Sequence, residues 1–158
     1  MCNEKQALIY SIRIIEAELL QKRNGCSGCN YISNTYTLYT LGSTIHFDPL
    51  EAWSIEMLKS YDSDLTSAIA DRRNLFCERL AYGMQETEPE RFGLLSERLP
   101  PICTEKQWLV DLLCANSEHR QNACAAGYTI GEFRSELMTY SVETLRAYAA
   151  YLDDLHEI

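Results

Sequence analysis

The sequence predicts an all-α fold, a helical bundle formed by two related halves within a single domain of 158 residues. Apolar residues recur at helical spacing along most of the chain, which is the pattern of amphipathic helices. In addition, one helical segment occurs twice. Residues 53–65 return as residues 140–152, with Ser, Glu, Leu, Tyr and Leu in the same register. A repeated amphipathic helix is typical of a helical domain with internal pseudo-twofold symmetry.

The halves that we expect cover residues 3–99 and 104–158, and the proline-containing break Leu99–Ile102 separates them because proline cannot continue a helix. Residues 3–9 and 104–110 share a capping residue, charged residues and the apolar register. Each half is therefore expected to consist of a capped helix, a polar crossover and a second capped helix.

Side chains that accept hydrogen bonds from free backbone N–H groups mark the expected helix starts. These capping residues are Asn3, Ser54, Thr87, Thr104, Thr129 and Ser141. Apolar residues at helical spacing then mark the buried faces, for example Leu58, Tyr61, Leu65 and Ile69 in the helix that Ser54 caps.

The crossover of the first half, residues 25–47, is a long segment without helical periodicity that is rich in cysteine and tyrosine. Loops of this length inside a compact domain are usually functional or disordered. Its aromatic residues favour an ordered loop that packs over the helices. We therefore expect this loop to form a wall or lid of any binding site.

The composition excludes several function classes. The formal net charge is −9, and this argues against a nucleic acid or an anionic membrane as partner, since both need a basic face. The sequence has no apolar run long enough to span a bilayer, and residues 1–5 do not resemble a secretory signal. A cytoplasmic location is the expectation. The seven cysteines are then expected to be reduced thiols.

Several motifs are spread over most of the chain from Trp53 onward. They are Arg73-Asn74-Leu75 followed by Glu78, Ala81-Tyr82 and Met84; Thr87-x-Pro89-Glu90; Leu99-Pro100-Pro101-Ile102 with Glu105-Lys106; and Arg134-x-Glu136-Leu137-x-Thr139-Tyr140-Ser141 with Thr144-Leu145 and Tyr148. The first helix, which includes Glu16, matches more weakly. Together these motifs resemble a bacterial family of helical proteins, domain of unknown function 4125.

The resemblance implies a helical fold and a glycine-rich crossover that carries a cysteine, the position at which Cys29 stands. This chain departs from the family between Cys29 and Trp53, where the tyrosine-rich insert replaces a shorter segment with a basic residue. It also ends without a second copy of the helix that follows Arg73. The family has no assigned activity, so the resemblance ranks residues and names no reaction.

The sharpest local motif is Cys26-x-x-Cys29, in which Gly25 and Gly28 allow both thiols to turn toward one point. Such a pair can be half of a zinc site or a redox pair, and Cys29 alone could act as a nucleophile. The alternative is two unpaired thiols in a glycine turn. The further ligands that zinc needs would come from Cys2, His46, Cys103, Cys114, His119 or Cys124.

The candidate ligand-binding residues are Arg73, Asn74, Glu78 and Tyr82, their counterparts Arg134 and Glu136, and Glu16 of the first helix. A helix N-terminus next to a guanidinium can hold a carboxylate or a phosphate. The alternative is a structural ion pair of Arg73 with Asp71 or Glu78. A di-metal carboxylate site is not expected, since it requires Glu-x-x-His pairs that the sequence lacks.

These observations predict a cytoplasmic helical protein that binds a small anionic or peptide ligand, or a protein partner, in a cleft between the two halves. The alternative is a thiol- or metal-dependent enzyme that uses Cys26 and Cys29, with zinc as the cofactor. No phosphate-binding glycine loop or nucleophile elbow is present in the sequence.

Overall fold

The computed structural model describes residues 3–22, 46, 49–116 and 130–156. This part of the chain contains helices and no strand, which confirms the all-α prediction. The helices are α1 (Glu4–Lys22), η3 (Leu50–Ala52), α3 (Ile55–Ala70), α4 (Leu75–Thr87), α5 (Pro89–Leu95), η4 (Ser96–Arg98), α6 (Thr104–Ala115), α8 (Ile130–Met138) and α9 (Val142–His156). The predicted crossover loop lies outside the described residues except for His46, and so does the predicted cap Thr129.

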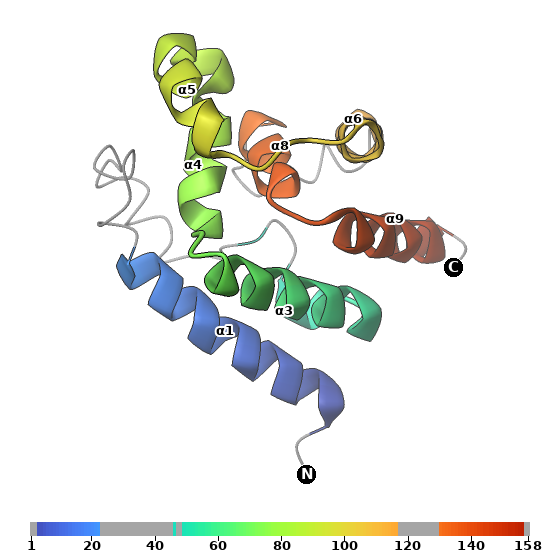
Figure 1. Ribbon diagram of the computed structural model, residues 1–158. Coiled ribbons are helices and arrows are strands. Elements are labelled where there is room, and N and C mark those ends of the chain that lie inside the picture. Colours follow the sequence, from blue (N-terminus) through green and yellow to red (C-terminus); the bar gives the residue numbers. More distant parts are fainter. Residues whose placement is uncertain (1–2, 23–45, 47–48, 117–129, 157–158) are drawn as a thin grey trace.

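The helices pack in a closed circuit, in which each contacts the next (Figure 1). Helix α1 packs against α3, α3 against α9, α9 against α6, α6 against α8, α8 against α4, and α4 against α1. Helix α5 packs against α4 and η4, and it buries none of its residues. None of the described helices combines the length and the apolar character that crossing a membrane requires.

The helix starts at Asn3, Ser54 and Ser141 follow the prediction. The Asn3 side chain accepts from the N–H of Gln6 at 2.8 Å, and Ser54 accepts from Met57 at 3.2 Å. Ser141 accepts from the N–H of the residue three positions later, also at 3.2 Å. Each cap satisfies a backbone donor that a helix cannot satisfy internally.

The predicted start at Thr87 is wrong, because α4 continues through this residue. The Thr87 hydroxyl donates back to the carbonyl of Gly83 at 3.3 Å, as a helical threonine does. Helix α5 then begins at Pro89, and Glu88 precedes it without a side-chain cap. Proline at the first helical position lacks the N–H that a cap would satisfy and has a helical φ, so it starts the helix by itself.

The predicted cap at Thr104 is one residue too late, since Thr104 is the first residue of α6. Cys103 precedes the helix in extended conformation, and its sulfur accepts from the N–H of Lys106 at 3.4 Å. The cap therefore comes from a residue type with weak acceptor character, which sequence preferences for helix starts do not favour.

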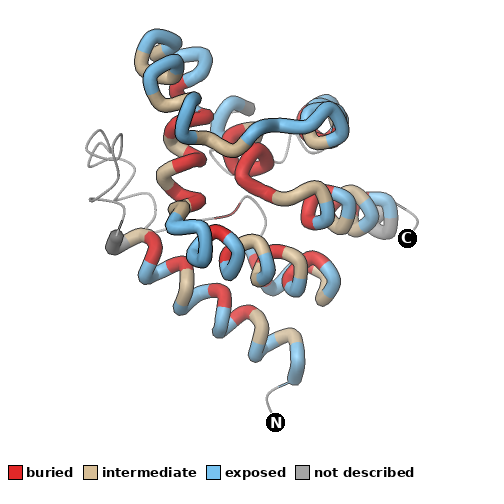
Figure 2. Tube along the Cα trace, viewed as in Figure 1, coloured by how far each residue is buried: buried red, intermediate tan, exposed pale blue. Residues whose placement is uncertain are grey.

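The core is formed by the helix faces that point into the circuit (Figure 2). Its largest fully buried side chains are aromatic: Trp53, Tyr61, Phe76, Phe133 and Tyr140. The predicted inner face of α3 is confirmed at Leu58, Tyr61 and Leu65, and it is wrong at Ile69, which is 45% exposed. The stripe ends on Ala68 instead, because a period of 3.6 residues brings position 68 under Leu65.

We predict that Ser141→Ala lowers the free energy of unfolding by about 1 kcal/mol, because the N–H of Thr144 loses its acceptor at the start of α9. Urea unfolding of the variant measures this loss. Ser67→Ala, on the exposed face of α3, is the matched control and should leave the midpoint unchanged. Equal midpoints for Ser141→Ala and the wild type would contradict a cap at Ser141.

Candidate functional site

A hydrogen-bonded group of polar side chains lies in the middle of the core. We call it the His46 cluster; its members are Glu16, His46, Tyr61, Arg79, Glu136 and Tyr140. All of them are buried, with 7% or less of each residue exposed. They come from α1, α3, α4, α8, the turn after α8 and the stretch before η3. The cluster therefore joins parts of the chain that are far apart in sequence.

His46 lies between two carboxylates. Its Nε2 is 2.5 Å from Oε2 of Glu16, and its Nδ1 is 2.9 Å from Oε1 of Glu136. Tyr61 donates to the same oxygen of Glu16 at 2.9 Å, and Tyr140 donates to the same oxygen of Glu136 at 3.0 Å. The imidazole ring also makes edge contacts with Tyr61 and with the indole of Trp53, whose ring centre is 5.0 Å away.

The charges of the cluster compensate one another. Burial lowers the pKa of His46, but the Glu16 and Glu136 carboxylates raise it more, to about 9. Burial raises the pKa of Glu136, yet the hydrogen bond from His46 and the charge of Arg79, 3.8 Å away, hold it below the ordinary value. Near neutral pH the imidazolium and the guanidinium therefore balance the two carboxylates.

The arrangement does not suit a metal ion. The carboxylates of Glu16 and Glu136 bond to opposite nitrogens of one imidazole ring, so their oxygens point at the ring from different sides. Across residues 3–22, 49–116 and 130–156 and at His46, no three His, Cys, Asp or Glu side chains are grouped as metal ligands would be. The zinc candidates Cys26 and Cys29 lie outside the described residues, so that prediction stays a prediction.

A second group of polar residues lies nearby, beginning at the junction of α3 and α4. Arg72 adopts a left-handed conformation with φ of 59°, and the N–H of Arg73 then bonds to the carbonyl of Ala68 at 2.7 Å, as in a Schellman helix end. This turn directs Arg73 toward Glu78, to which it donates twice, at 2.7 and 2.9 Å. The sequence suggests an ion pair of Arg73 as the alternative to a ligand site, and this pair is present with Glu78.

Asn74 fixes the start of α4. Its side-chain oxygen accepts from the N–H of Phe76 at 3.0 Å, and its amide donates to the carbonyl of Leu19 on α1 at 2.7 Å. The same side chain thus caps α4 and ties it to α1. Beside it, burial and the charge of Glu78 raise the pKa of Tyr82 to about 12, so its hydroxyl stays protonated near neutral pH.

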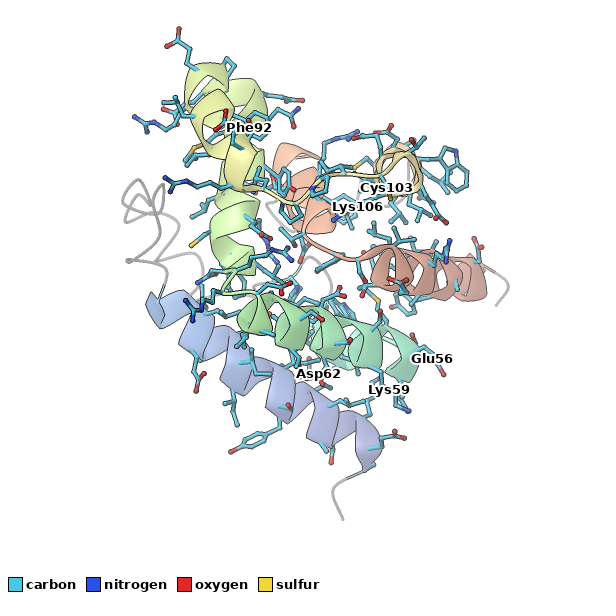
Figure 3. All side chains as sticks on the ribbon, in the orientation of Figure 1. Glu56, Lys59, Asp62, Phe92, Cys103 and Lys106 are labelled. Carbon is cyan, nitrogen blue, oxygen red and sulfur yellow. The ribbon has the colours of Figure 1, made fainter. Side chains whose placement is uncertain are left out.

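Lys106 approaches this junction from the first turn of α6, where it lies together with Cys103 (Figure 3). Its side chain is half-buried, and burial lowers its pKa. The charges of Glu78 and Asp64 oppose that shift, and the charge of Arg73 adds to it. No other described residue forms a hydrogen bond or an ion pair with the Lys106 ammonium.

Asp64 connects this region to the start of α9. One of its carboxylate oxygens accepts from the N–H of Ser141 at 2.9 Å and from the hydroxyl of Thr144 at 2.7 Å. Asp64 therefore ties α3 to the start of α9, and it forms one electrostatic group with Arg73, Glu78, Tyr82 and Lys106. We call this group the Lys106 cluster; its members are Asp64, Arg73, Glu78, Tyr82 and Lys106.

The structure separates the residues that the sequence proposed for one site. Glu16 and Glu136 belong to the His46 cluster, while Arg73, Glu78 and Tyr82 belong to the Lys106 cluster, next to the cap Asn74. Arg134, the proposed partner of Arg73, lies on α8 and donates to Asp111 of α6 at 2.8 Å. Arg134 and Arg73 therefore pair with different carboxylates, Arg134 with Asp111 of α6 and Arg73 with Glu78 of α4.

One of the described cysteines departs from the expected reduced state. Cys77 on α4 is disulfide-bonded, and its partner is neither Cys103 nor Cys114, which are free thiols. The partner therefore lies outside the described residues.

Sequence reasoning named Glu16 and Glu136 of the His46 cluster and three members of the Lys106 cluster, and it missed Arg79, Asp64 and Lys106 as site residues. Arg79 and Glu136 occupy positions on the apolar stripes of α4 and α8, and Glu16 lies between Ile12 and Leu19 on the stripe of α1. A charged residue on an apolar stripe must find a partner in the core. That rule would have added Arg79 to the candidates Glu16 and Glu136, whereas no feature of the sequence points to Lys106.

Two comparisons, one with curated proteins and one with solved structures, gave no match to this chain. A third comparison matched residues 6–158 to the family described as protein of unknown function (DUF4125). The match covers nearly the whole chain and confirms the resemblance that its motifs suggested. The chain belongs to this DUF4125 family.

Proposed function

We propose that the protein binds an anionic group at the Lys106 cluster, either a small molecule with a carboxylate or phosphate or an acidic side chain of a peptide or protein partner. The observation that carries the proposal is the half-buried side chain of Lys106, whose ammonium forms no hydrogen bond or ion pair with any other described residue. Partial burial of an ammonium without a hydrogen-bonding partner is unfavourable, and a bound anion would supply that partner.

The surroundings of Lys106 favour an anion. Lys106 lies in the first turn of α6, and the start of a helix carries partial positive charge and free backbone N–H groups. Arg73 adds a guanidinium, and its two bonds to Glu78 use two of its five donors. Asp64 is already bonded to the start of α9, so its carboxylate competes less for the ammonium.

The two related halves are part of this proposal. Helix α1 packs on α3 as α6 packs on α9, and α3 meets α9 between them. This correspondence supports a pseudo-twofold arrangement, in which Asp64, Arg73 and Glu78 belong to the first half and Lys106 to the second. An anion at the Lys106 cluster would then bind between the halves.

Substitution of Lys106 by methionine tests the proposal. We expect Lys106→Met to weaken the binding of phosphate or succinate by about tenfold or more, since one charge-assisted contact contributes roughly 1.5–3 kcal/mol. Isothermal titration calorimetry measures the affinities. Because methionine retains most of the apolar stem and removes the charge, stability should change little.

The matched control is Lys59→Met. Lys59 is exposed on α3, pairs with Glu4 at 2.8 Å, and is shown in Figure 3 on a different helix from Lys106. This variant makes the same change in net charge and should bind both anions as the wild type does. Equal weakening by the two lysine variants would indicate a nonspecific charge effect, and no binding by the wild type would contradict the proposal for these anions.

A further inference from the structure

We infer that His46 is a buried imidazolium that locks α1 to α8 and thereby fixes the chain at Tyr140–Ser141, where the first turn of α9 begins. The inference concerns how the fold is held and does not depend on anion binding. It makes His46 a positioning residue, whose proton is a structural component of the core.

The first argument is the hydrogen-bond geometry. Both ring nitrogens lie within bonding distance of a carboxylate oxygen, at 2.5 Å for Glu16 and 2.9 Å for Glu136. Each of these oxygens also accepts from a tyrosine hydroxyl. A neutral imidazole would turn the lone pair of one nitrogen toward a carboxylate oxygen. Only the imidazolium donates from both nitrogens.

The second argument is the charge balance of every element packed around the ring. Helix α1 contributes the Glu16 carboxylate, α3 the Tyr61 hydroxyl, α4 the Arg79 guanidinium and α8 the Glu136 carboxylate. Tyr140 adds a second hydroxyl from the turn after α8, and burial raises the pKa of both tyrosines well above 10, so they are neutral. Without the His46 proton, the carboxylates of Glu16 and Glu136 would both lose the cationic ring that lies between them.

The third argument concerns the chain neighbours of the cluster. Tyr140 bonds to Glu136 and lies 3.0 Å from His46, and the next residue, Ser141, donates its N–H to Asp64. Arg79, which faces Glu136, directly follows Glu78. Loss of the His46 proton would make Glu16 and Glu136 repel each other. The repulsion would displace the end of α8 and strain the Ser141–Asp64 bond.

Nitrogen-15 NMR of the imidazole rings tests this directly in the wild-type protein. We expect both nitrogens of His46 to carry protons at pH 7.5, when an ordinary histidine is mostly neutral. The proton should be lost only well above pH 8, and the amide resonance of Ser141 should shift along the same titration curve. A His46 ring with a single proton at pH 7.5 would overturn the inference.

A charge-balanced pair of substitutions provides an independent test. We expect His46→Gln to lower the urea midpoint, and Glu16→Gln added to it to restore part of the loss by removing one buried carboxylate. The matched control adds Glu18→Gln, on the exposed face of α1, to His46→Gln. We expect it to leave the urea midpoint of the His46→Gln variant unchanged. Equal midpoints for both double variants would contradict the charge balance. If His46→Gln does not fold, the nitrogen-15 NMR spectra of the wild-type protein test the inference without it.

Discussion

Replacing Glu136 with glutamine is expected to lower the free energy of unfolding by about 3–5 kcal/mol, the usual cost of removing one partner from a buried ion pair. Glu136 accepts from His46 and from Tyr140, and the guanidinium of Arg79 lies 3.8 Å away. Glutamine has nearly the same shape but no charge, so it removes the carboxylate that bonds to the imidazolium of His46 and faces the guanidinium of Arg79. Urea unfolding at pH 7 measures the effect.

The matched control is Glu132→Gln, one turn earlier on the same helix. Glu132 is exposed, and surface charges contribute at most about 1 kcal/mol. The two variants change the net charge equally, so the difference between them isolates burial and the contacts of Glu136. A loss below about 1 kcal/mol for Glu136→Gln would contradict an ionic core cluster.

The stability of the wild-type protein is expected to fall as the pH rises from about 6.5 toward 9. The pKa of His46 is raised from 6.5 to about 9 in the folded state, so its stabilising contribution is complete below pH 6.5 and is lost as the pH rises through 9. Between these values the folded chain binds one more proton than the unfolded chain. Linkage then gives a decline of about 1.4 kcal/mol for each pH unit.

Urea unfolding at several pH values from 6 to 8.5 measures this decline, and it stays below the range in which most lysines and tyrosines titrate. His46→Gln is the control, because it lacks the titrating group and should show a flatter profile over the same range. Profiles that run parallel for the wild type and the variant would show that His46 does not cause the pH dependence.

The fold class could be predicted because the apolar period of 3.6 residues is visible in nearly every helix. The starts at Asn3, Ser54 and Ser141 could be predicted because these side chains are strong caps, and their bonds are local. The start of α6 could not, since Cys103 is a weak acceptor and the stronger candidate Thr104 stands next to it. The capping preferences of residue types therefore do not show which of two neighbouring residues caps a helix.

The candidate site was less predictable because its bonds are long-range. Arg73 and Glu78 are five residues apart, and sequence spacing was enough to propose their ion pair. By contrast, 90 residues separate His46 from Glu136, and no local pattern brings them together. The position of Lys106 depends in the same way on how α6 packs against α8 and α9.

The measurement that tests the proposed anion site most directly is a phosphate titration of the isotope-labelled wild-type protein, followed through its backbone amide resonances. We expect saturable shifts at Lys106 and Arg73 and at the helix starts Asn74, Cys103 and Ser141, and their loss in Lys106→Met. Shifts that do not saturate, or that lie on other parts of the protein, would contradict a binding site at the Lys106 cluster.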